Sequence, residues 1–477
     1  MKTKILLLLL FSNLFSASGA HNNLYHGEGL SFFYVVPFIG MLLSIAILPL
    51  LAHKFWENNY GKIALFWAFV FYFPFLIIEK QFAFAGYEFF KVMLTEYIPF
   101  IVLLFSLYTI SGGILLKGKL AGNPKTNTII LAIGTSVASF MGTTGAAMLL
   151  IRPLLRANKS RKNKIHTVVF FIFLVANIGG SLTPLGDPPL FLGFLKGVDF
   201  FWTTTNMFLP MLTISIILLL VYYILDTKLY NKENLNDEKI NYENSKESLA
   251  LKGKINFIFL LGVIMAVLLS GSDSLKWPIF KVTIGDYIVE VLKGNVLRDL
   301  ILLGMAMLSL VFTKNSYRKE NGFTWHPIME VAKLFIGIFI TIIPALVILN
   351  NNQSFFSDMS YSLYFWLTGV LSSFLDNAPT YLVFFEAAGL SKAMSSFDVN
   401  AFQSAISSNP ILNSKLLAIS LGAVFMGANT YIGNAPNFMV KSIAEENGVK
   451  MPSFFGYMVW SILILVPCFV IINLIFL

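Results

Sequence analysis

Charged side chains are scarce in this sequence, since Asp, Glu, Lys and Arg together make up 12% of its 477 residues. Soluble domains carry about 25% charged residues, so the scarcity excludes an ordinary soluble protein. Hydrophobic residues supply 56% of the chain, which is typical of a protein that crosses the membrane many times. We therefore expect an all-α polytopic membrane protein whose main partner is the lipid bilayer.

Cysteine and histidine are rare as well. The one cysteine, Cys468, excludes an intramolecular disulfide. The five histidines lie in predicted loops or at the ends of predicted spans and lack metal-ligand spacing: His21, His26, His53, His166 and His326. The sequence contains neither H-E-x-x-H nor the phosphate loop G-x-x-x-x-G-K-[ST]. We therefore expect no enzyme, no ATP-driven cycle and no cofactor other than coupling ions, Na⁺ and/or H⁺.

Basic residues outnumber acidic ones by enough to give a net charge of +9. They occupy short connections between apolar runs, as the positive-inside rule requires, and so they do not indicate a nucleic-acid partner. The segments predicted to be cytoplasmic carry Lys54, Lys62, Lys117, Lys119, Lys125, Arg152, Arg156, Lys159, Arg161, Lys162, Lys164, Lys314, Arg318, Lys319, Lys441 and Lys450. The opposite loops, near 79–96, 272–298 and 391–413, mix signs or carry little charge.

Apolar runs long enough to cross a bilayer recur along the chain. We predict about ten transmembrane helices, at 31–51, 62–79, 97–116, 165–195, 205–226, 255–271, 299–313, 334–350, 414–440 and 453–476. Residues 1–20 resemble a signal peptide, with Lys2 and Lys4 before an apolar run and Ser18-Gly19-Ala20 as a cleavage site. An uncleaved first helix is the alternative.

One twelve-residue stretch occurs twice. Gly180–Phe191 and Gly427–Phe438 both read G-x-x-T-x-[LI]-G-[DN]-x-P-x-F. Each copy interrupts a long apolar segment with glycine, proline and side-chain oxygens. Two ordinary loops would not share seven positions of twelve, so we predict two broken helices, at 165–195 and 414–440.

Two further apolar stretches, 127–151 and 361–390, carry polar residues at their centres. We predict that they are re-entrant hairpins, because irregular backbone at membrane depth must line a cavity or be buried in protein. Each hairpin precedes its broken helix, which indicates two inverted-topology repeats meeting at the midplane. The predicted halves are residues 21–227 and 255–477, joined by a charged cytoplasmic linker at 228–254.

The hairpin tips and broken helices should meet at the centre of the membrane. The candidate ion- or substrate-binding residues are Thr143, Thr144, Asn177, Thr183, Gly186, Asp187, Asp376, Asn377, Thr380, Asn429, Thr430, Gly433 and Asn434. Carboxylate, amide and hydroxyl oxygens suit a hard cation, and we assign Asp376, Asn377 and Thr430 to sodium. Half-helix N-termini would instead favour an anion, so this geometry leaves the sign of the substrate open.

The carboxylates Asp187 and Asp376 favour a cation. An ionisable side chain at membrane depth is expensive and usually functional, and a carboxylate that holds either a proton or sodium can exchange one for the other. The alternative is that each aspartate merely caps a helix start. Arg152, which follows the first hairpin, could bind a carboxylate substrate, but the cytoplasmic edge of the membrane explains it more simply.

The motifs at 179–189, 374–380 and 426–437 resemble those of the ion transporter superfamily, which includes NhaD-type sodium/proton antiporters, arsenite permeases, citrate–metal carriers and sodium–dicarboxylate symporters. The nearest likeness is to the bacterial branch of NhaD-type and citrate-transporter-like (CitMHS-like) proteins. The resemblance implies scaffold and transport domains, a multi-pass protein of the bacterial inner membrane and a possible homodimer. Thr143-Thr144 and Asn377 stand where the dicarboxylate branch has Ser-Asn-Thr, which disfavours a dicarboxylate.

From these features we expect a secondary active transporter, with sodium/proton antiport by alternating access as the main hypothesis. The alternative is a sodium- or proton-coupled carrier of citrate or another organic anion. Either substrate, a small inorganic cation or an organic anion, would bind where the two repeats meet.

Overall fold

The computed structural model describes residues 30–79, 81–118, 120–233, 249–356, 358–391, 406 and 409–477. The predicted signal peptide at 1–20 lies outside the described residues. So do most of the predicted linker at 228–254 and most of the predicted outer loop at 391–413. These three predictions therefore stay predictions.

Apolar helices dominate the described residues. Nine of them are long and apolar enough to cross a membrane: Phe32–Leu51, His53–Glu79, Phe82–Gly112, Ile165–Leu182, Trp202–Asn231, Lys293–Phe312, His326–Asn351, Pro410–Asn429 and Phe454–Phe476. A shorter apolar helix covers Asn256–Ser270. Each of the ten predicted spans overlaps one of these helices, so the predicted all-α polytopic fold is confirmed.

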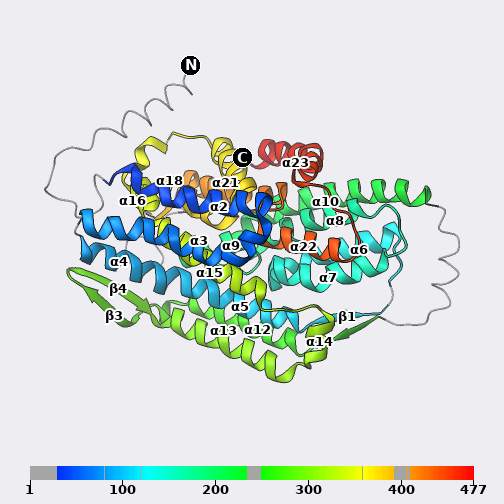
Figure 1. Ribbon diagram of the computed structural model, residues 1–477, viewed down its shortest axis with the longest axis horizontal. Coiled ribbons are helices and arrows are strands. Elements are labelled where there is room, and N and C mark those ends of the chain that lie inside the picture. The colour runs from blue at the N-terminus through cyan, green and yellow to red at the C-terminus, as the bar shows by residue number, and fades with distance from the viewer. Residues whose placement is uncertain are drawn as a thin grey trace, which may run out of the picture.

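The helices outside the repeated motifs form a broad frame. In chain order they are η2 (Phe32–Val35), α2 (Val36–Leu51), α3 (His53–Pro74), η3 (Phe75–Glu79), α4 (Phe82–Val92), η4 (Met93–Tyr97), α5 (Ile98–Gly112), α10 (Trp202–Asn231), α12 (Asn256–Ser270), η6 (Asp273–Leu275), α13 (Lys293–Phe312), α14 (Asn315–Glu320), α15 (His326–Thr341), α16 (Ile343–Asn351), η7 (Gln353–Phe356) and α23 (Phe454–Phe476). Figure 1 shows the long helices running roughly parallel, as helices that cross one bilayer must.

Two segments differ from the prediction. The supposed loop at 79–96 contains α4, which continues through η4 into α5 as one apolar element of 31 residues. The mixed charges of this segment suggested a loop, but Glu88 and Lys91 are one helical turn apart and pair with each other at 3.2 Å. Among the described residues there are also two short antiparallel sheets, β1 (Leu115–Lys117) with β2 (Ala250–Lys252) and β3 (Pro278–Ile284) with β4 (Tyr287–Leu292).

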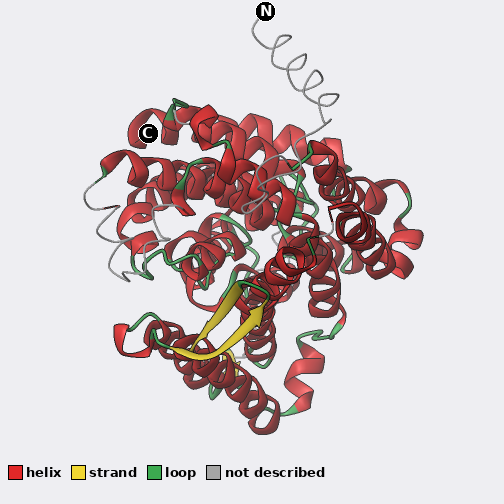
Figure 2. Ribbon diagram, turned by 90° about the vertical axis from the view of Figure 1, so that its left-hand side faces the viewer, coloured by secondary structure: helices red, strands yellow, loops and turns green. Residues whose placement is uncertain are grey.

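The two sheets mark opposite ends of the molecule. In Figure 1, β3 and β4 lie at the left end of the helices, and β1 and α14 lie at the right end. Figure 2 looks along the helices from the left, with the β3–β4 hairpin in front of them. The β1 and α14 end carries the basic connections that we predict to be cytoplasmic.

Both predicted hairpins and both broken helices are present. The first hairpin is α6 (Pro124–Met141) and α7 (Thr143–Ala157), and the second is α17 (Tyr361–Phe374) and α18 (Asn377–Ala387). The first broken helix is α8 (Ile165–Leu174), η5 (Ile178–Leu182) and α9 (Pro188–Leu195); the second is α21 (Pro410–Met426), η8 (Gly427–Asn429) and α22 (Ala435–Glu446). Gly142 turns the first hairpin with a φ of +78°, a conformation that favours glycine.

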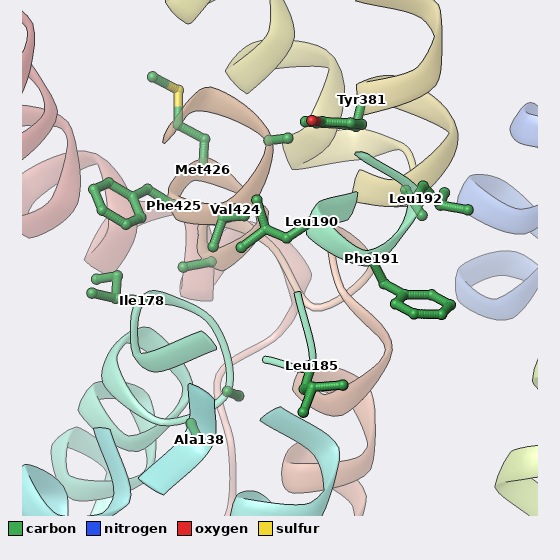
Figure 3. Packing of buried hydrophobic residues seen from close by; sticks show 14 of the residues in the cluster. Ala138, Ile178, Leu185, Leu190, Phe191, Leu192, Tyr381, Val424, Phe425 and Met426 are labelled. Atoms are coloured by element: carbon green, nitrogen blue, oxygen red, sulfur yellow. The ribbon is translucent and has the colours of Figure 1, made fainter. Parts of the chain in front are cut away.

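The half-helices pack across the repeats. The hairpin helix α7 lies against α22, and α18 lies against α9. Gly193 of α9 faces Tyr381 of α18 so closely that a Cβ at Gly193 would collide with the tyrosine ring. Figure 3 shows the buried side chains of Leu190 and Val424 packed together, with Tyr381 nearby.

The two pairs of half-helices run to opposite ends of the molecule. Near the end of α7, Arg156 donates a hydrogen bond to the carbonyl of Leu116 in β1. Immediately after α9, Lys196 forms an ion pair with Glu96 of η4 at 2.5 Å. All four half-helices therefore begin at the centre and point outward, which is the arrangement that inverted repeats produce.

Candidate functional site

Asp187 is the centre of the site. Its side chain is 1% exposed and lies just before α9. Its carboxylate accepts hydrogen bonds from Asn377 Nδ2 at 2.7 Å, Asn434 Nδ2 at 2.9 Å and Thr143 Oγ1 at 3.3 Å. These donors stand at the starts of α18, α22 and α7, so one carboxylate joins the starts of all four half-helices.

The electrostatics of this junction follow from the helix ends. The first backbone N–H groups of a helix have no partner within the helix and create a positive potential at its N-terminus. Four such ends meet around Asp187, and helix N-termini attract negatively charged groups. Asp187 makes no side-chain cap hydrogen bond to α9. The capping alternative therefore does not explain this aspartate.

Glycine permits the backbone to close around Asp187. A Cβ on Gly186 would collide with the carbonyl oxygen of Gly180, and the same contact relates Gly433 to Gly427 in the second motif. Gly186 also accepts a hydrogen bond on its carbonyl from the backbone N–H of Thr143, at 2.9 Å. The repeated glycines of the motif thus allow each unwound segment to fold back on itself.

Each hairpin is fastened to its broken helix in the same way. Thr183 donates its hydroxyl to the carbonyl of Ser139, and Thr430 donates to the carbonyl of Ser373. The hydroxyls of the two serines in turn donate to Gly179 O and Met426 O. Thr183 and Thr430 therefore hold the two hairpins in equivalent places.

A chain of amides joins the two broken helices. Asn177 Nδ2 donates to Asn437 Oδ1 at 2.7 Å, and Asn434 Nδ2 lies 3.2 Å from Asn177 Oδ1. Asn437 donates in turn to the carbonyls of Gly427 and Thr430, at 2.9 Å each. Unwound backbone frees these carbonyls from helical hydrogen bonds, and buried amides satisfy them.

Asp376 has a different environment. Its Oδ1 accepts from the backbone N–H of Ala378 at 3.0 Å, so this aspartate does cap α18 as the alternative hypothesis stated. Its own carbonyl accepts from Thr380 Oγ1, also at 3.0 Å. Asp376 lines the central cavity as Asp187 does, but it is only half-buried.

Two buried amide oxygens near the second hairpin lack a hydrogen-bond donor among the described residues. They are Asn377 Oδ1 and Asn429 Oδ1. The amide nitrogens of the same residues are occupied, by Asp187 and by Ser373 Oγ. Unpaired buried oxygens are costly, and a hard cation is a partner that would satisfy them.

A cavity extends from Asp187 between the hairpin tips and the frame, and its empty space together with the adjoining solvent is about 840 Å³. The motif residues that line it are Gly142, Thr143, Thr144, Gly145, Gly186, Asp187, Asp376 and Asn434. From the frame, α5 and α15 contribute Leu103, Leu107, Tyr108, Ile328, Val331 and Phe335.

The structure brings most predicted site residues together but leaves some apart. Thr143, Asp187, Asn377 and Asn434 touch, and Asn177 joins them through Asn434. No hydrogen bond among the described residues joins Thr430 to Asp376 or Asn377, the other two residues assigned to sodium. Thr183, Thr430 and Gly433 shape the backbone and do not line the cavity. Gly186 lines it, but its carbonyl oxygen already accepts a hydrogen bond from Thr143.

Sequence reasoning missed three residues of this network. Ser139 and Ser373 hold the broken helices, and Asn437 joins the two halves. The serines occupy equivalent places just before the hairpin tips, so the repeat itself could have indicated them. Asn437 stands where the first motif has Leu190, and a polar residue that replaces an apolar one was the available signal.

Comparison with known proteins agrees with this architecture. The family described as "Putative citrate transport" matches residues 27–477, which is nearly the whole chain. None of the curated proteins compared with the chain matches it.

Proposed function

Because this chain belongs to the citrate transport family matched above, we propose that it is a secondary carrier of citrate or a related organic anion, driven by Na⁺ or H⁺. The observation that carries the proposal is the meeting of four half-helix N-termini at one cavity. Family membership favours this alternative over the sodium/proton antiport that the sequence alone favoured.

The anion would bind in the cavity beside Thr143 and Thr144. Backbone N–H groups at helix starts are a ready anion site, and the hydroxyls of both threonines add donors. Thr143 already donates to Asp187, whereas Thr144 lines the cavity one residue further into α7. A carboxylate of the substrate would lie over the start of α7.

The coupling cation would bind on the other side of the same junction. Asp376, Asn377 and Asn429 occupy the positions at which the first repeat has Gly142, Thr143 and Leu182. At these three positions the second repeat therefore carries more side-chain oxygen atoms than the first. A cation there would neutralise part of the charge that the anion brings, so each would strengthen the binding of the other.

Cation/proton antiport is the second candidate, and one observation favours it. The cavity is lined by two carboxylates, Asp187 and Asp376, and its described lining residues include no lysine or arginine. An antiporter needs an acidic site that binds cations and protons in turn. In both cases we propose a bacterial inner membrane with the basic loops in the cytoplasm, and a homodimer remains a prediction.

Transport by the purified protein separates the two candidates. Proteoliposomes with an imposed sodium or proton gradient should accumulate labelled citrate, and dissipating the driving gradient should stop the accumulation. Internal pH reported by a dye in the same vesicles tests antiport. Sodium-driven proton movement without citrate, together with no uptake of any polycarboxylate, would overturn the organic-anion proposal.

A further inference from the structure

Half-buried Arg152 differs from the buried residues Arg161, Arg298 and Arg318 in its hydrogen bonds. Each of the four has one buried guanidinium nitrogen without a hydrogen-bond partner among the described residues, Nη1 in Arg152, but for Arg152 no hydrogen bond from the rest of the guanidinium is found there either. Arg161, Arg298 and Arg318 each donate hydrogen bonds from their guanidinium groups, to Glu233, Asp299 and the carbonyl of Thr109. Burying a guanidinium nitrogen without a partner is costly, so its placement requires an explanation.

Arg152 lies on the face of α7 that leads to the central cavity. Thr144, Met148 and Arg152 are spaced four residues apart, which puts them on one side of the helix. Thr144 lines the cavity, and Met148 packs against Tyr108 and Ile328, which also line it. Arg152 is one turn further, at the end of α7 that we predict to be cytoplasmic.

The surroundings of Arg152 supply little competing charge. The guanidinium lies against Gly322, where a Cβ would collide with it. The charged groups that it senses are Glu446 at the end of α22 and Arg156 on its own helix, along with the hydroxyl of Tyr108. Glu446 is exposed, and none of the ion pairs found within 4.0 Å among the described residues joins it to Arg152.

We propose that Arg152 is an entry subsite that holds a carboxylate of the organic anion at the cytoplasmic mouth of the cavity. The planar guanidinium matches a carboxylate with two parallel hydrogen bonds. Eight residues of α-helix separate Thr144 from Arg152, a distance of about 12 Å. One small anion cannot span that distance, so the ligand contacts Arg152 before or after it occupies the central site.

This subsite rests on the proposed function and makes a directional prediction. Everted vesicles expose the cytoplasmic face, and right-side-out vesicles expose the opposite face. In everted vesicles, Arg152→Gln should raise the half-saturating citrate concentration about tenfold, since a hydrogen bond to a charged group is lost. In right-side-out vesicles the same variant should bind citrate as the wild type does.

Two further variants make the measurement decisive. Arg156→Gln removes the same charge one turn away, from an exposed side chain, and should leave citrate binding unchanged on both sides. Arg152→Lys keeps the charge and loses the planar fork, so it should give an intermediate loss in everted vesicles. If Arg152→Gln does not fold, Arg152→Lys provides the test instead. Citrate binding by Arg152→Lys that equals that of the wild type would then overturn the subsite.

The remaining outcomes show whether the Arg152 subsite or the proposed citrate transport has failed. The subsite alone would be overturned if wild-type vesicles take up citrate and the half-saturating citrate concentration in everted vesicles is the same for Arg152→Gln as for Arg156→Gln. Wild-type vesicles that take up no polycarboxylate, together with purified protein that citrate does not stabilise against heat, would overturn both. Loss of citrate binding in Arg152→Gln on the cytoplasmic side only is the result that supports the subsite.

Discussion

Asn434 donates a hydrogen bond from Nδ2 to Oδ1 of Asp187 across 2.9 Å, and the two residues occupy the same position of the two repeated motifs. Equivalent residues of two repeats can touch only where the pseudo-twofold axis between the repeats passes. The pair therefore marks the centre of the inverted-repeat architecture. It also explains why one position is acidic and the other an amide: two carboxylates in contact would repel each other, whereas an amide donates to the acid.

The first prediction concerns the amide that joins the halves. Asn437→Leu places in the second motif the residue type found at Leu190 in the first. The change leaves the carbonyls of Gly427 and Thr430 without their donor, and we expect a loss of about 3 kcal/mol of stability. Thermal unfolding of the detergent-solubilised protein measures the loss. Asn58→Ala is the control, because Asn58 donates to a backbone carbonyl from an exposed position, and it should leave the melting temperature nearly unchanged.

The second prediction tests the close backbone contact beside Asp187. Gly186→Ala should destabilise the protein by about 3 kcal/mol, because the added methyl overlaps the carbonyl of Gly180. Gly304→Ala in α13 is the matched control, since a Cβ there meets no atom within 4 Å and should stabilise the helix by about 0.5–1 kcal/mol. Equal stability of the two alanine variants would mean that the unwound segment adjusts freely.

The third prediction concerns competition between sodium and protons. If Asp376 binds the coupling sodium, a proton on its carboxyl group excludes the cation. The half-saturating sodium concentration for citrate uptake should then fall as pH rises, by at most about tenfold per pH unit while the carboxyl remains mostly protonated. Uptake measured across a pH series at several sodium concentrations checks this. Asp376→Asn should abolish the pH dependence, and a sodium requirement that ignores pH in the wild type would leave Asp376 as a helix cap only.

The fourth prediction fixes the orientation in the membrane. With Cys468 replaced by alanine, a cysteine at the exposed position Lys159 should react with an impermeant maleimide only from the cytoplasm. A cysteine at the exposed position Lys281 of β3 should react only from the opposite side. Lys159 follows α7 and Lys281 belongs to β3, and Figure 1 shows these two elements toward opposite ends of the molecule. Labelling of both from one side would contradict the inverted topology.

Much of the fold could be predicted from sequence because its signals are local. Apolar runs located the spans, and the repeated glycines, prolines and oxygens of 180–191 and 427–438 located both broken helices. The repeat also placed Asn434 opposite Asp187. The helix α4 was missed because its mixed charges fit two structures equally well: an exposed loop, or a helix in which Glu88 and Lys91 pair with each other.

Contacts across the halves were harder to predict because they depend on side-chain direction. The Asn177–Asn437 hydrogen bond joins residues that do not correspond in the repeat, and no spacing rule connects them. Asn429, by contrast, was predicted for its oxygen, and that oxygen is one of three buried asparagine oxygens without a donor among the described residues. The lack of a hydrogen-bond partner for Arg152 could not be predicted at all, since it depends on which residues surround the guanidinium.

Citrate counterflow with Asp187→Asn tests the central claim most directly. Wild-type proteoliposomes loaded with unlabelled citrate should accumulate labelled citrate without an imposed gradient. Asp187→Asn turns an acceptor of three hydrogen bonds into an amide, and leaving two buried donors without an acceptor costs about 3 kcal/mol. Counterflow by a well-folded Asp187→Asn protein should therefore fall about a hundredfold. Counterflow at the wild-type rate in that variant would contradict the account that transport depends on the junction of four half-helices at Asp187.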